Sequence, residues 1–170
     1  MQLRPYASRD CPALAELFYQ TVHRVNARDY DPEQLEAWAP ERVDLAAWDA
    51  SFRAHHTRIA EQDGVIWGFA DLGDRDGAGY LDRLYVRWDR QGRGVATVLC
   101  DALERKARQL GFSAICTDAS ITAKPFFLAR GYRVLREQRV ERRGVWLTNF
   151  RMEKALASAP AEQSAWSGKR

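Results

Sequence analysis

The sequence predicts one mixed α/β (α+β) domain, with a mostly antiparallel sheet of about seven strands, a central parallel pair and flanking helices. Two-residue turns at Asp63-Gly64 and Arg143-Gly144 each join two apolar runs, as in antiparallel hairpins. A strand, a helix and another strand follow one another between residues 80 and 118, which requires a right-handed crossover and therefore a parallel pair. A chain of 170 residues suits a single core of this kind.

The N-terminal part of the chain predicts a short strand followed by three helices. Residues 1–5 form the strand, and Ser8 or Asp10 caps the first helix, which has a proline in its first turn. Asp31 starts the second helix, with a proline and a capping-box glutamine after it, and Asp44 starts the third. The chain therefore makes a helical excursion before it returns to the sheet.

The remaining chain alternates strands and helices in an order that completes the sheet. Apolar residues at helical spacing after Gly94 predict a long helix that ends at Gly111. We expect the domain to cover residues 1–154 and residues 155–170 to form a disordered tail, because small and polar residues dominate there. The expected strands are 56–61, 65–71, 77–87, 114–117, 132–140 and 145–152, and the expected helices are 95–110 and 122–129.

The composition is that of an ordinary globular protein. Hydrophobic residues make up 46% and charged residues 29% of the chain, which excludes collagen-like, disordered and coiled-coil classes. No apolar run approaches the ~20 residues of a membrane helix, and the N-terminus lacks the pattern of a secretory signal. Cys11, Cys100 and Cys116 are odd in number and widely spaced, so we expect reduced thiols. These features predict a cytoplasmic protein.

A glycine-containing loop, Gln91-Gly92-Arg93-Gly94-Val95-Ala96, joins a predicted strand to the long helix. Its glycines let consecutive backbone N–H groups point outward, and a helix N-terminus favours anions, so the loop suits a phosphate. A tight turn without a ligand is the alternative. The loop is neither a Walker motif nor a good dinucleotide fingerprint, since Thr97 stands at the third glycine position. The sequence therefore predicts another phosphate-bearing cofactor.

Several segments resemble the GNAT superfamily of acyl-CoA-dependent N-acetyltransferases. They are Leu84-Tyr85-Val86, the Gln-x-x-Gly-x-Ala loop with its helix, and Thr122–Phe127 leading to Arg130-Gly131-Tyr132. The resemblance covers residues 1 to about 154, and the segments 118–127 and 147–154 further resemble a poorly characterised bacterial branch. It implies a GNAT-like fold and acetyl-CoA as the co-substrate.

The resemblance also implies how acetyl-CoA is held. Backbone groups of Leu84, Tyr85 and Val86 would bind the pantetheine arm, and Phe126 and Phe127 would flank it. The pyrophosphate would lie on N–H groups of Gln91, Gly92, Arg93, Gly94, Val95, Ala96 and Thr97.

The chemistry of acetyl transfer requires a neutral amine, because only the free amine attacks a thioester. For a lysine-like amine of pKa ~10.4, deprotonation at pH 7 costs ~4.6 kcal/mol, so a general base is useful. Asp82 precedes the phosphate loop on its strand and resembles, in placement, the carboxylate that serves as base in some family members. A surface ion pair with Arg83 or Arg87 is the alternative role.

Many family members protonate the leaving thiolate with a tyrosine four residues before a glycine, but this chain has Phe127 at that place. Ser120, Tyr85 or water could substitute, and Ser120 could instead only cap the helix that follows.

Aromatic residues Tyr30, Trp38 and Trp67 are candidates for binding the acceptor, together with acidic residues of the helical excursion. This combination suits a cationic or aromatic amine, although simple packing against the sheet explains each aromatic residue equally well.

The sequence thus predicts an acetyl-CoA-dependent N-acetyltransferase that acts on a primary amine of a small molecule by direct attack in a ternary complex. A peptide or protein amine is the close variant. A non-catalytic acyl-CoA-binding sensor is the alternative that Phe127 motivates. Nucleic-acid binding by the basic C-terminal hairpin is weaker, because the net charge is only +3 and the signs are mixed there. We expect no metal, nucleic acid or membrane as a partner. The sequence does not decide whether the protein forms a homodimer.

Overall fold

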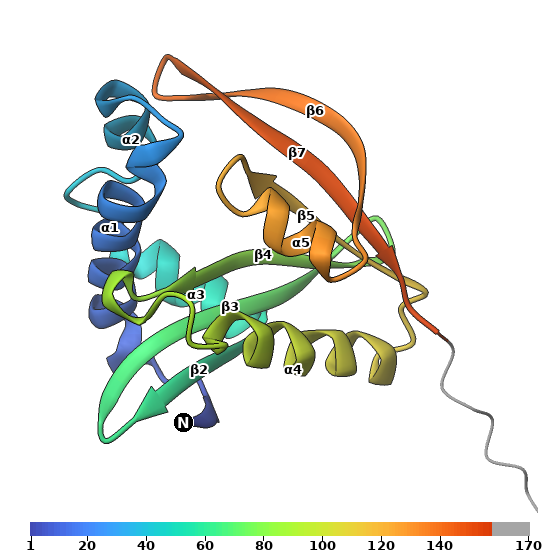
Figure 1. Ribbon diagram of the computed structural model, residues 1–170. Helices are drawn as coiled ribbons and strands as arrows, with labels where there is room; N and C mark the ends of the chain where they lie inside the picture. Colours follow the sequence, from blue (N-terminus) through green and yellow to red (C-terminus); the bar gives the residue numbers. More distant parts are fainter. Residues whose placement is uncertain (158–170) are drawn as a thin grey trace, which may run out of the picture.

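The computed structural model describes residues 1–157, and within them seven strands form one sheet in the order β1-β2-β3-β4-β5-β7-β6 (Figure 1). Only β4 and β5 pair in parallel. This arrangement confirms the predicted mixed fold. The strands are β1 (Gln2–Pro5), β2 (His56–Gln62), β3 (Val65–Arg75), β4 (Ala78–Val86), β5 (Ala114–Ser120), β6 (Arg133–Arg142) and β7 (Val145–Ala155), and the helices are α1 (Cys11–Val25), α2 (Pro32–Trp38), α3 (Leu45–Ala54), α4 (Val95–Gln109) and α5 (Lys124–Ala129).

The two predicted hairpin turns form as expected. Asp63 and Gly64 have φ of 53° and 75° between β2 and β3, and Arg143 and Gly144 have φ of 50° and 79° between β6 and β7. Two consecutive positive φ values match the right-handed twist of antiparallel strands. The helix starts are confirmed as well, because the Asp31 and Asp44 carboxylates accept the N–H groups of Gln34 and Ala47. Asp10 instead accepts the N–H of Ala7, one turn before α1.

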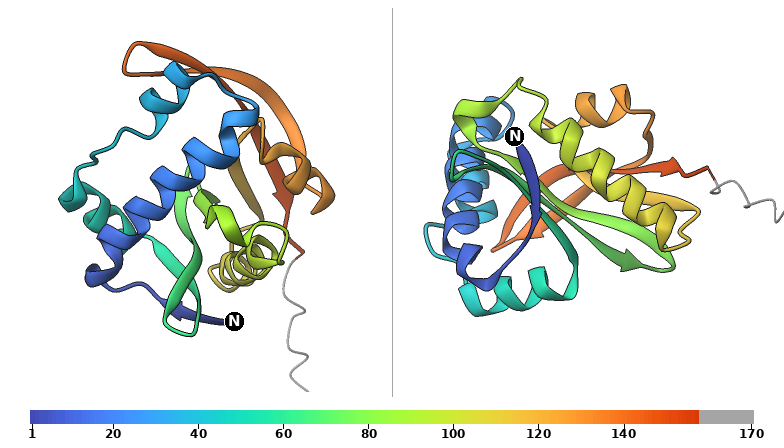
Figure 2. Two further views of the ribbon diagram at one scale, coloured as in Figure 1. Left: turned by 60° about the vertical axis from the view of Figure 1, so that its left-hand side comes forward. Right: turned by 90° about the horizontal axis from the view of Figure 1, so that it is seen from below.

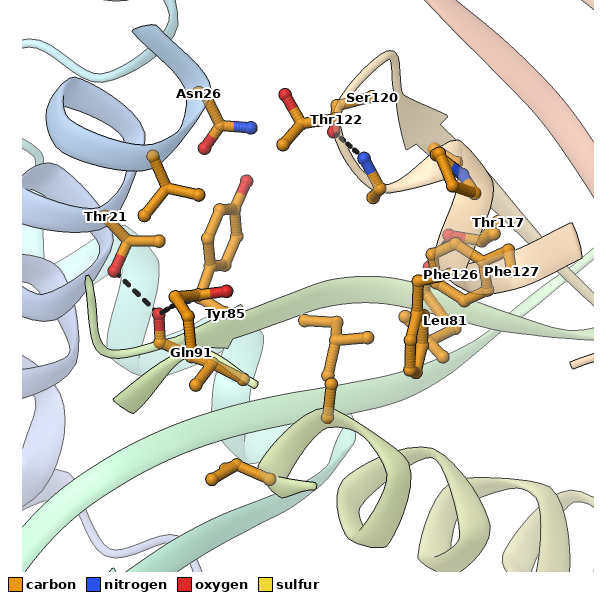
Figure 3. Close-up of a pocket in the computed structure, with 18 of the residues that line it drawn as sticks. Thr21, Asn26, Leu81, Tyr85, Gln91, Thr117, Ser120, Thr122, Phe126 and Phe127 are labelled. Atoms are coloured by element: carbon orange, nitrogen blue, oxygen red, sulfur yellow. Dashed lines mark hydrogen bonds between the residues drawn. The ribbon is translucent and has the colours of Figure 1, made fainter. Parts of the chain in front are cut away.

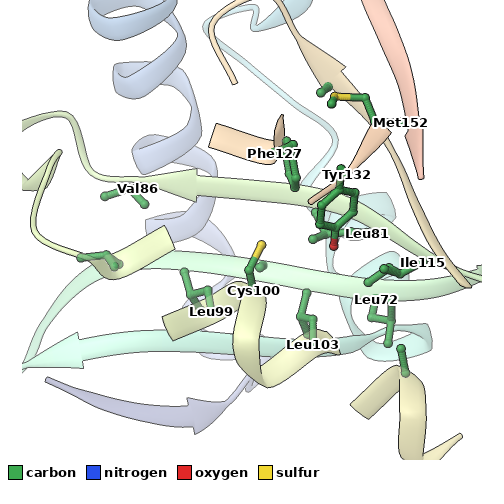
Figure 4. Packing of buried hydrophobic residues seen from close by; sticks show 14 of the residues in the cluster. Leu72, Leu81, Val86, Leu99, Cys100, Leu103, Ile115, Phe127, Tyr132 and Met152 are labelled. Carbon is green, nitrogen blue, oxygen red and sulfur yellow. The ribbon is translucent and has the colours of Figure 1, made fainter. Parts of the chain in front are cut away.

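Alternate residues of the sheet face two separate cores. Ile59 and Phe69 pack with α1 and α3, while their neighbours Ala60 and Ala70 pack with α4 on the opposite face. Figure 2 shows the helices of the excursion grouped on one side and α4 on the other. Figure 4 shows the core on the α4 side of the sheet, in which the buried face of α4 (Leu99, Cys100, Leu103) packs against β3, β4 and β5. The sheet is therefore covered on both faces.

The central parallel pair is short, and this feature creates the site. Residues 79–81 of β4 pair with residues 115–117 of β5, and the two strands then part. Beyond this point β4 continues along β3 as far as Val86, and β5 continues along β7 as far as Ser120. The Thr117 hydroxyl donates to the Leu81 carbonyl at 2.8 Å where the pairing ends. The diverging halves leave a wedge at the middle of the sheet.

Several boundaries differ from the predicted ones. The Ser120 hydroxyl accepts the N–H of Ala123, which extends β5 into a turn and delays α5 to Lys124. β7 reaches Ala155, and the buried Leu156 donates its N–H to the Ser113 carbonyl, so these two residues pack with the domain rather than in the predicted tail. The rest of that tail, residues 158–170, lies outside the described residues. Among the described helices, none has the length and apolar character needed to cross a membrane.

Candidate functional site

A cavity of about 560 Å³ occupies the wedge between β4 and β5 (Figure 3). It is lined by all but one of the residues that the sequence analysis assigned to the cofactor, namely Leu84, Tyr85, Val86, Gln91, Gly92, Gly94, Val95, Ala96, Thr97, Phe126 and Phe127. The exception, Arg93, is exposed on the loop and does not line the cavity. Arg28 and Arg90 also line it, and the sequence analysis selected neither of them.

The glycine loop presents backbone N–H groups to this cavity. Gly92 and Gly94 have φ of 70° and 77°, a conformation that residues with a Cβ rarely adopt. The first intrahelical bond joins the N–H of Val98 to the Gly94 carbonyl, so the N–H groups of Val95, Ala96 and Thr97 have no partner within α4. No side chain caps Gly94. The start of α4 is thus an open donor site for an anion.

Two side chains fix the end of β4 relative to this loop. The Val86 carbonyl accepts hydrogen bonds from the Gln91 side-chain amide at 2.7 Å and from the Thr21 hydroxyl at 3.0 Å (Figure 3). Thr21 is a buried residue of α1. The α1 helix, the strand and the glycine loop are therefore held together at one corner of the cavity.

Asp82 lies at an irregularity in β4. Asp71 of β3 pairs with Arg83 and Leu72 pairs with Leu81, so Asp82 is an extra residue, a β-bulge. Bulges bend a strand and re-aim a side chain, and they are common beside active sites. Asp82 lines the wedge and has 35% of its side chain exposed. Burial, together with the nearby charge of Asp71, raises the pKa of Asp82.

A buried network lies behind Asp82. The Asp71 carboxylate is fully buried and accepts hydrogen bonds from His55 Nδ1 at 2.6 Å, Arg83 Nη2 at 2.6 Å and the Arg83 N–H at 3.0 Å. His55 Nδ1 and Arg83 Nη2 each lie 3.9 Å from the Asp82 carboxylate. The hydrogen bond to Asp71 raises the pKa of His55, which favours its charged form. Gly73 makes room for this ring, since a Cβ there would lie 2.8 Å from His55 Nε2.

This network bears on two sequence expectations. Asp82 is near Arg83, as the ion-pair alternative supposed, whereas Arg87 pairs with Asp89 at 2.8 Å. The sequence analysis expected no metal, yet ligand atoms of His55, Asp71 and Asp82 lie within 4.8 Å of one another. The guanidinium of Arg83 donates hydrogen bonds to both oxygens of Asp71 and lies 3.9 Å from Asp82, so a cation already contacts two members of this group.

Ser120 and Phe127 stand on the β5 side of the wedge. Ser120 Oγ accepts the N–H of Ala123 at 3.0 Å, which is the capping role considered for it, and its own O–H remains able to donate. Phe127 is 2% exposed and packs edge-on against Phe126 and Tyr132. Tyr85 faces the same space from β4, and burial raises its pKa.

A smaller cavity of about 220 Å³ adjoins the wedge. Its wall is largely aromatic and aliphatic: Phe18, Tyr30, Trp38, Trp48, Tyr85, Val140 and Leu147. Asp82, Ser120 and Tyr85 line both cavities, so the two spaces meet at these residues.

The three aromatic candidates for acceptor binding lie in different places. Trp38 lines both cavities. Tyr30 lines the smaller one, but its hydroxyl already donates to the Thr148 carbonyl and accepts the N–H of Ile121. Trp67 lines neither, and the Arg90 guanidinium lies 5.1 Å from its ring centroid.

Comparison with known proteins agrees with this geometry. Residues 26–154 match the family model described as an acetyltransferase (GNAT) domain. The chain belongs to the GNAT acetyltransferase family. It is 34% identical over 152 residues to the uncharacterized N-acetyltransferase YafP of Escherichia coli K12, a match that covers 89% of this chain and 94% of YafP. As a member of this family, the protein is an N-acetyltransferase.

Solved structures show the same fold. A GCN5-related N-acetyltransferase from Rhodopseudomonas palustris superposes with a TM-score of 0.86 at 40% identity, covering 91% of this chain and 95% of the other. YncA from Salmonella typhimurium, solved with acetyl-CoA, gives a TM-score of 0.72 at 21% identity, covering 96% and 98%.

Proposed function

We propose that this GNAT protein binds acetyl-CoA in the larger cavity and a small primary amine in the smaller one, and transfers the acetyl group directly between them. The observation that carries this proposal is the junction of the two cavities at Asp82, Tyr85 and Ser120. A thioester that reaches this junction from one side meets an amine that enters from the other. Direct attack in a ternary complex needs this proximity.

The larger cavity has the donors that acetyl-CoA requires. The N–H groups at the start of α4 suit the pyrophosphate, and the cavity lining includes two cations, Arg28 and Arg90. The pantetheine arm carries amide groups, and the cavity-facing edge of β4 at Leu84 and Val86 has no neighbouring strand to pair with. Phe126 supplies an apolar wall. The structural neighbour YncA, which was solved with acetyl-CoA, supports the same co-substrate for this chain.

Asp82 is the proposed general base. The acceptor arrives as an ammonium ion and gives one proton to the Asp82 carboxylate, directly or through a water molecule. The neutral amine then attacks the thioester carbonyl, a C–N bond forms and the C–S bond breaks. The second amine proton ends on the sulfur of CoA, with the Ser120 hydroxyl or water as carrier. Burial of Asp82 makes its carboxylate more basic, which favours this role.

A proton donor for the sulfur is less important than the base. A thiol of pKa ~8.5 is an acceptable leaving group near neutral pH, whereas a lysine-like ammonium resists deprotonation by ~4.6 kcal/mol at pH 7. This difference accounts for an active site with Phe127 in place of a tyrosine. A cytoplasmic location completes the proposal and is supported by the three buried, unpaired thiols.

The test is release of CoA from acetyl-CoA in the presence of a panel of small amines. Asp82→Asn should lower kcat at least a hundredfold near neutral pH, while calorimetry shows unchanged affinity for acetyl-CoA. Asp76→Asn is a matched control, because it neutralises an exposed turn carboxylate and asparagine tolerates the positive φ there. Full activity of Asp82→Asn would refute the assignment of the base. Tight binding of acetyl-CoA without transfer to any amine would favour an acyl-CoA sensor instead.

A further inference from the structure

The smaller cavity is lined by two opposite charges, Asp82 and Arg142, that form no hydrogen bond with another charged side chain of residues 1–157. Its charged lining residues are Asp82, Arg83, Asp118 and Arg142. Arg83 is paired with Asp71, and Asp118 accepts hydrogen bonds from Arg75, Arg151, Gln138 and Tyr80. These two side chains are therefore already satisfied within the protein.

Asp82 and Arg142 differ from them. Asp82 lies 3.9 Å from both His55 Nδ1 and Arg83 Nη2, at the outer limit of an ion pair and beyond hydrogen-bond distance, so its oxygens can still accept hydrogen bonds from a ligand. The guanidinium of Arg142 donates to the backbone carbonyl of Glu141, and within residues 1–157 it forms no ion pair with a carboxylate. A carboxylate and a guanidinium that both lack a hydrogen-bonded ionic partner within residues 1–157 thus line the same small space.

The strand pattern explains why Arg142 faces this space. Side chains alternate between the two faces of a strand, so Arg142 shares a face of β6 with Val140, which packs against the aromatic core. Arg139 lies on the opposite face, where its guanidinium stacks over the exposed Trp146 at 5.7 Å. In Figure 1 the hairpin of β6 and β7 arches toward α2. Arg142 of β6 and Asp82 of β4 therefore line the smaller cavity from different strands.

The remaining wall is apolar, and the space is small. A volume of about 220 Å³ equals roughly seven water molecules at ~30 Å³ each. Trp38, Trp48 and Leu147 provide surfaces for a compact apolar group. A polyamine would bring a second positive charge against Arg142, and a lysine within a protein would bring no anion to it.

We propose that the acceptor is a free amino acid with an aromatic or branched apolar side chain. Its amino group would lie at Asp82, beside the thioester, and its carboxylate would pair with Arg142. Its side chain would pack on the aromatic wall. A guanidinium and a carboxylate form two parallel hydrogen bonds, which gives both affinity and orientation. This assignment rests on the proposed acetyl transfer, because it names the substrate class of the same site.

The experiment compares three matched amines, L-phenylalanine, L-phenylalaninamide and phenethylamine, by release of CoA. The wild type should prefer L-phenylalanine at least tenfold in kcat/KM over the two amines that lack the carboxylate. Arg142→Gln should lower kcat/KM for L-phenylalanine at least tenfold, mainly through KM, so that the preference disappears. Arg139→Gln is the control from the outer face of the same strand and should keep the preference. Arg142 is exposed, so its substitution spares the core.

The outcomes separate this inference from the proposed function. Equal turnover of the three amines, or a preference that survives Arg142→Gln, overturns carboxylate recognition while acetyl transfer stands. If L-phenylalanine is not turned over, calorimetry measures whether it binds to the CoA-bound protein. Binding that Arg142→Gln abolishes, without turnover, supports carboxylate recognition and contradicts transfer to this amine. Absence of both binding and turnover of L-phenylalanine and L-leucine overturns the inference.

Discussion

Replacement of His55 by glutamine should shift the pH dependence of catalysis, because His55 helps to keep Asp82 ionised. His55 Nδ1 lies 3.9 Å from the Asp82 carboxylate and 2.6 Å from Asp71. The hydrogen bond to Asp71 raises the pKa of His55, which favours its positively charged form in acidic buffer. Glutamine retains a hydrogen-bond donor for Asp71 but carries no charge.

The size of the effect follows from the distance between the charges. At 3.9 Å two unit charges interact by ~1.1 kcal/mol in water and by ~4 kcal/mol at an effective dielectric constant of ~20. Because 35% of the Asp82 side chain is exposed, the value in water is the better guide. At ~1.36 kcal/mol per pH unit, ~1.1 kcal/mol corresponds to ~0.8 of a pH unit.

The sign is fixed by the charge that is removed. A positive neighbour favours the carboxylate form, so its loss raises the pKa of Asp82, and the protein needs a higher pH to ionise its base. The acid limb of log(kcat/KM) against pH should therefore move upward by ~0.8 of a pH unit, with little change on the plateau. Each variant is assayed with acetyl-CoA and an accepted amine from pH 4 to pH 9.

His56→Gln is the matched control for this measurement. His56 is the next residue, and burial together with Arg58 and Lys106 lowers its pKa to about 4. Its substitution should leave the acid limb in place. An acid limb that stays fixed in His55→Gln, or moves to lower pH, would refute the electrostatic argument. Loss of wild-type activity on addition of a chelator would assign the cluster to a metal instead.

Three further predictions concern the cofactor loop, the leaving group and the core. Gly94→Val should weaken acetyl-CoA binding at least tenfold by calorimetry, whereas Gly111→Val, with φ of 81° at the other end of α4, should lower stability without changing affinity. Phe127→Tyr should alter kcat less than tenfold, and a larger gain, equivalent to ~1.4 kcal/mol, would mean that protonation of the thiolate limits the rate. Leu156→Ala should lower the free energy of unfolding by about 2 kcal/mol, because Leu156 is 7% exposed, while deletion of residues 158–170 should leave the thermal midpoint unchanged. An unchanged thermal midpoint in Leu156→Ala would contradict its place in the core.

The sequence predicts those parts of the fold that depend on residues close together in the chain. The turns at Asp63-Gly64 and Arg143-Gly144 depend on two adjacent residues, and the caps at Asp31 and Asp44 on four. The crossover through α4 follows from handedness, which leaves one parallel pair. The glycine loop could be singled out for the same reason, because the N–H groups of this candidate anion site are consecutive in one segment.

The surroundings of Asp82 could not be predicted in this way. His55, Asp71 and Asp82 come from three segments, and only the pairing register of β2, β3 and β4 brings them together. The bulge that re-aims Asp82 depends on how two strands align, which leaves no mark in either strand alone. Arg142 is one of several charges of mixed sign in the C-terminal hairpin, and the sequence alone does not show that it shares a strand face with Val140, which packs against the core.

Initial-rate kinetics with both substrates varied is the most direct test of the central claim, that acetyl-CoA and the amine occupy adjoining cavities at the same time. Transfer within a ternary complex predicts double-reciprocal plots that intersect. The three thiols are buried, which agrees with the absence of a cysteine nucleophile from this scheme. Parallel double-reciprocal plots, together with an acetylated protein trapped in the absence of amine, would contradict direct transfer at Asp82.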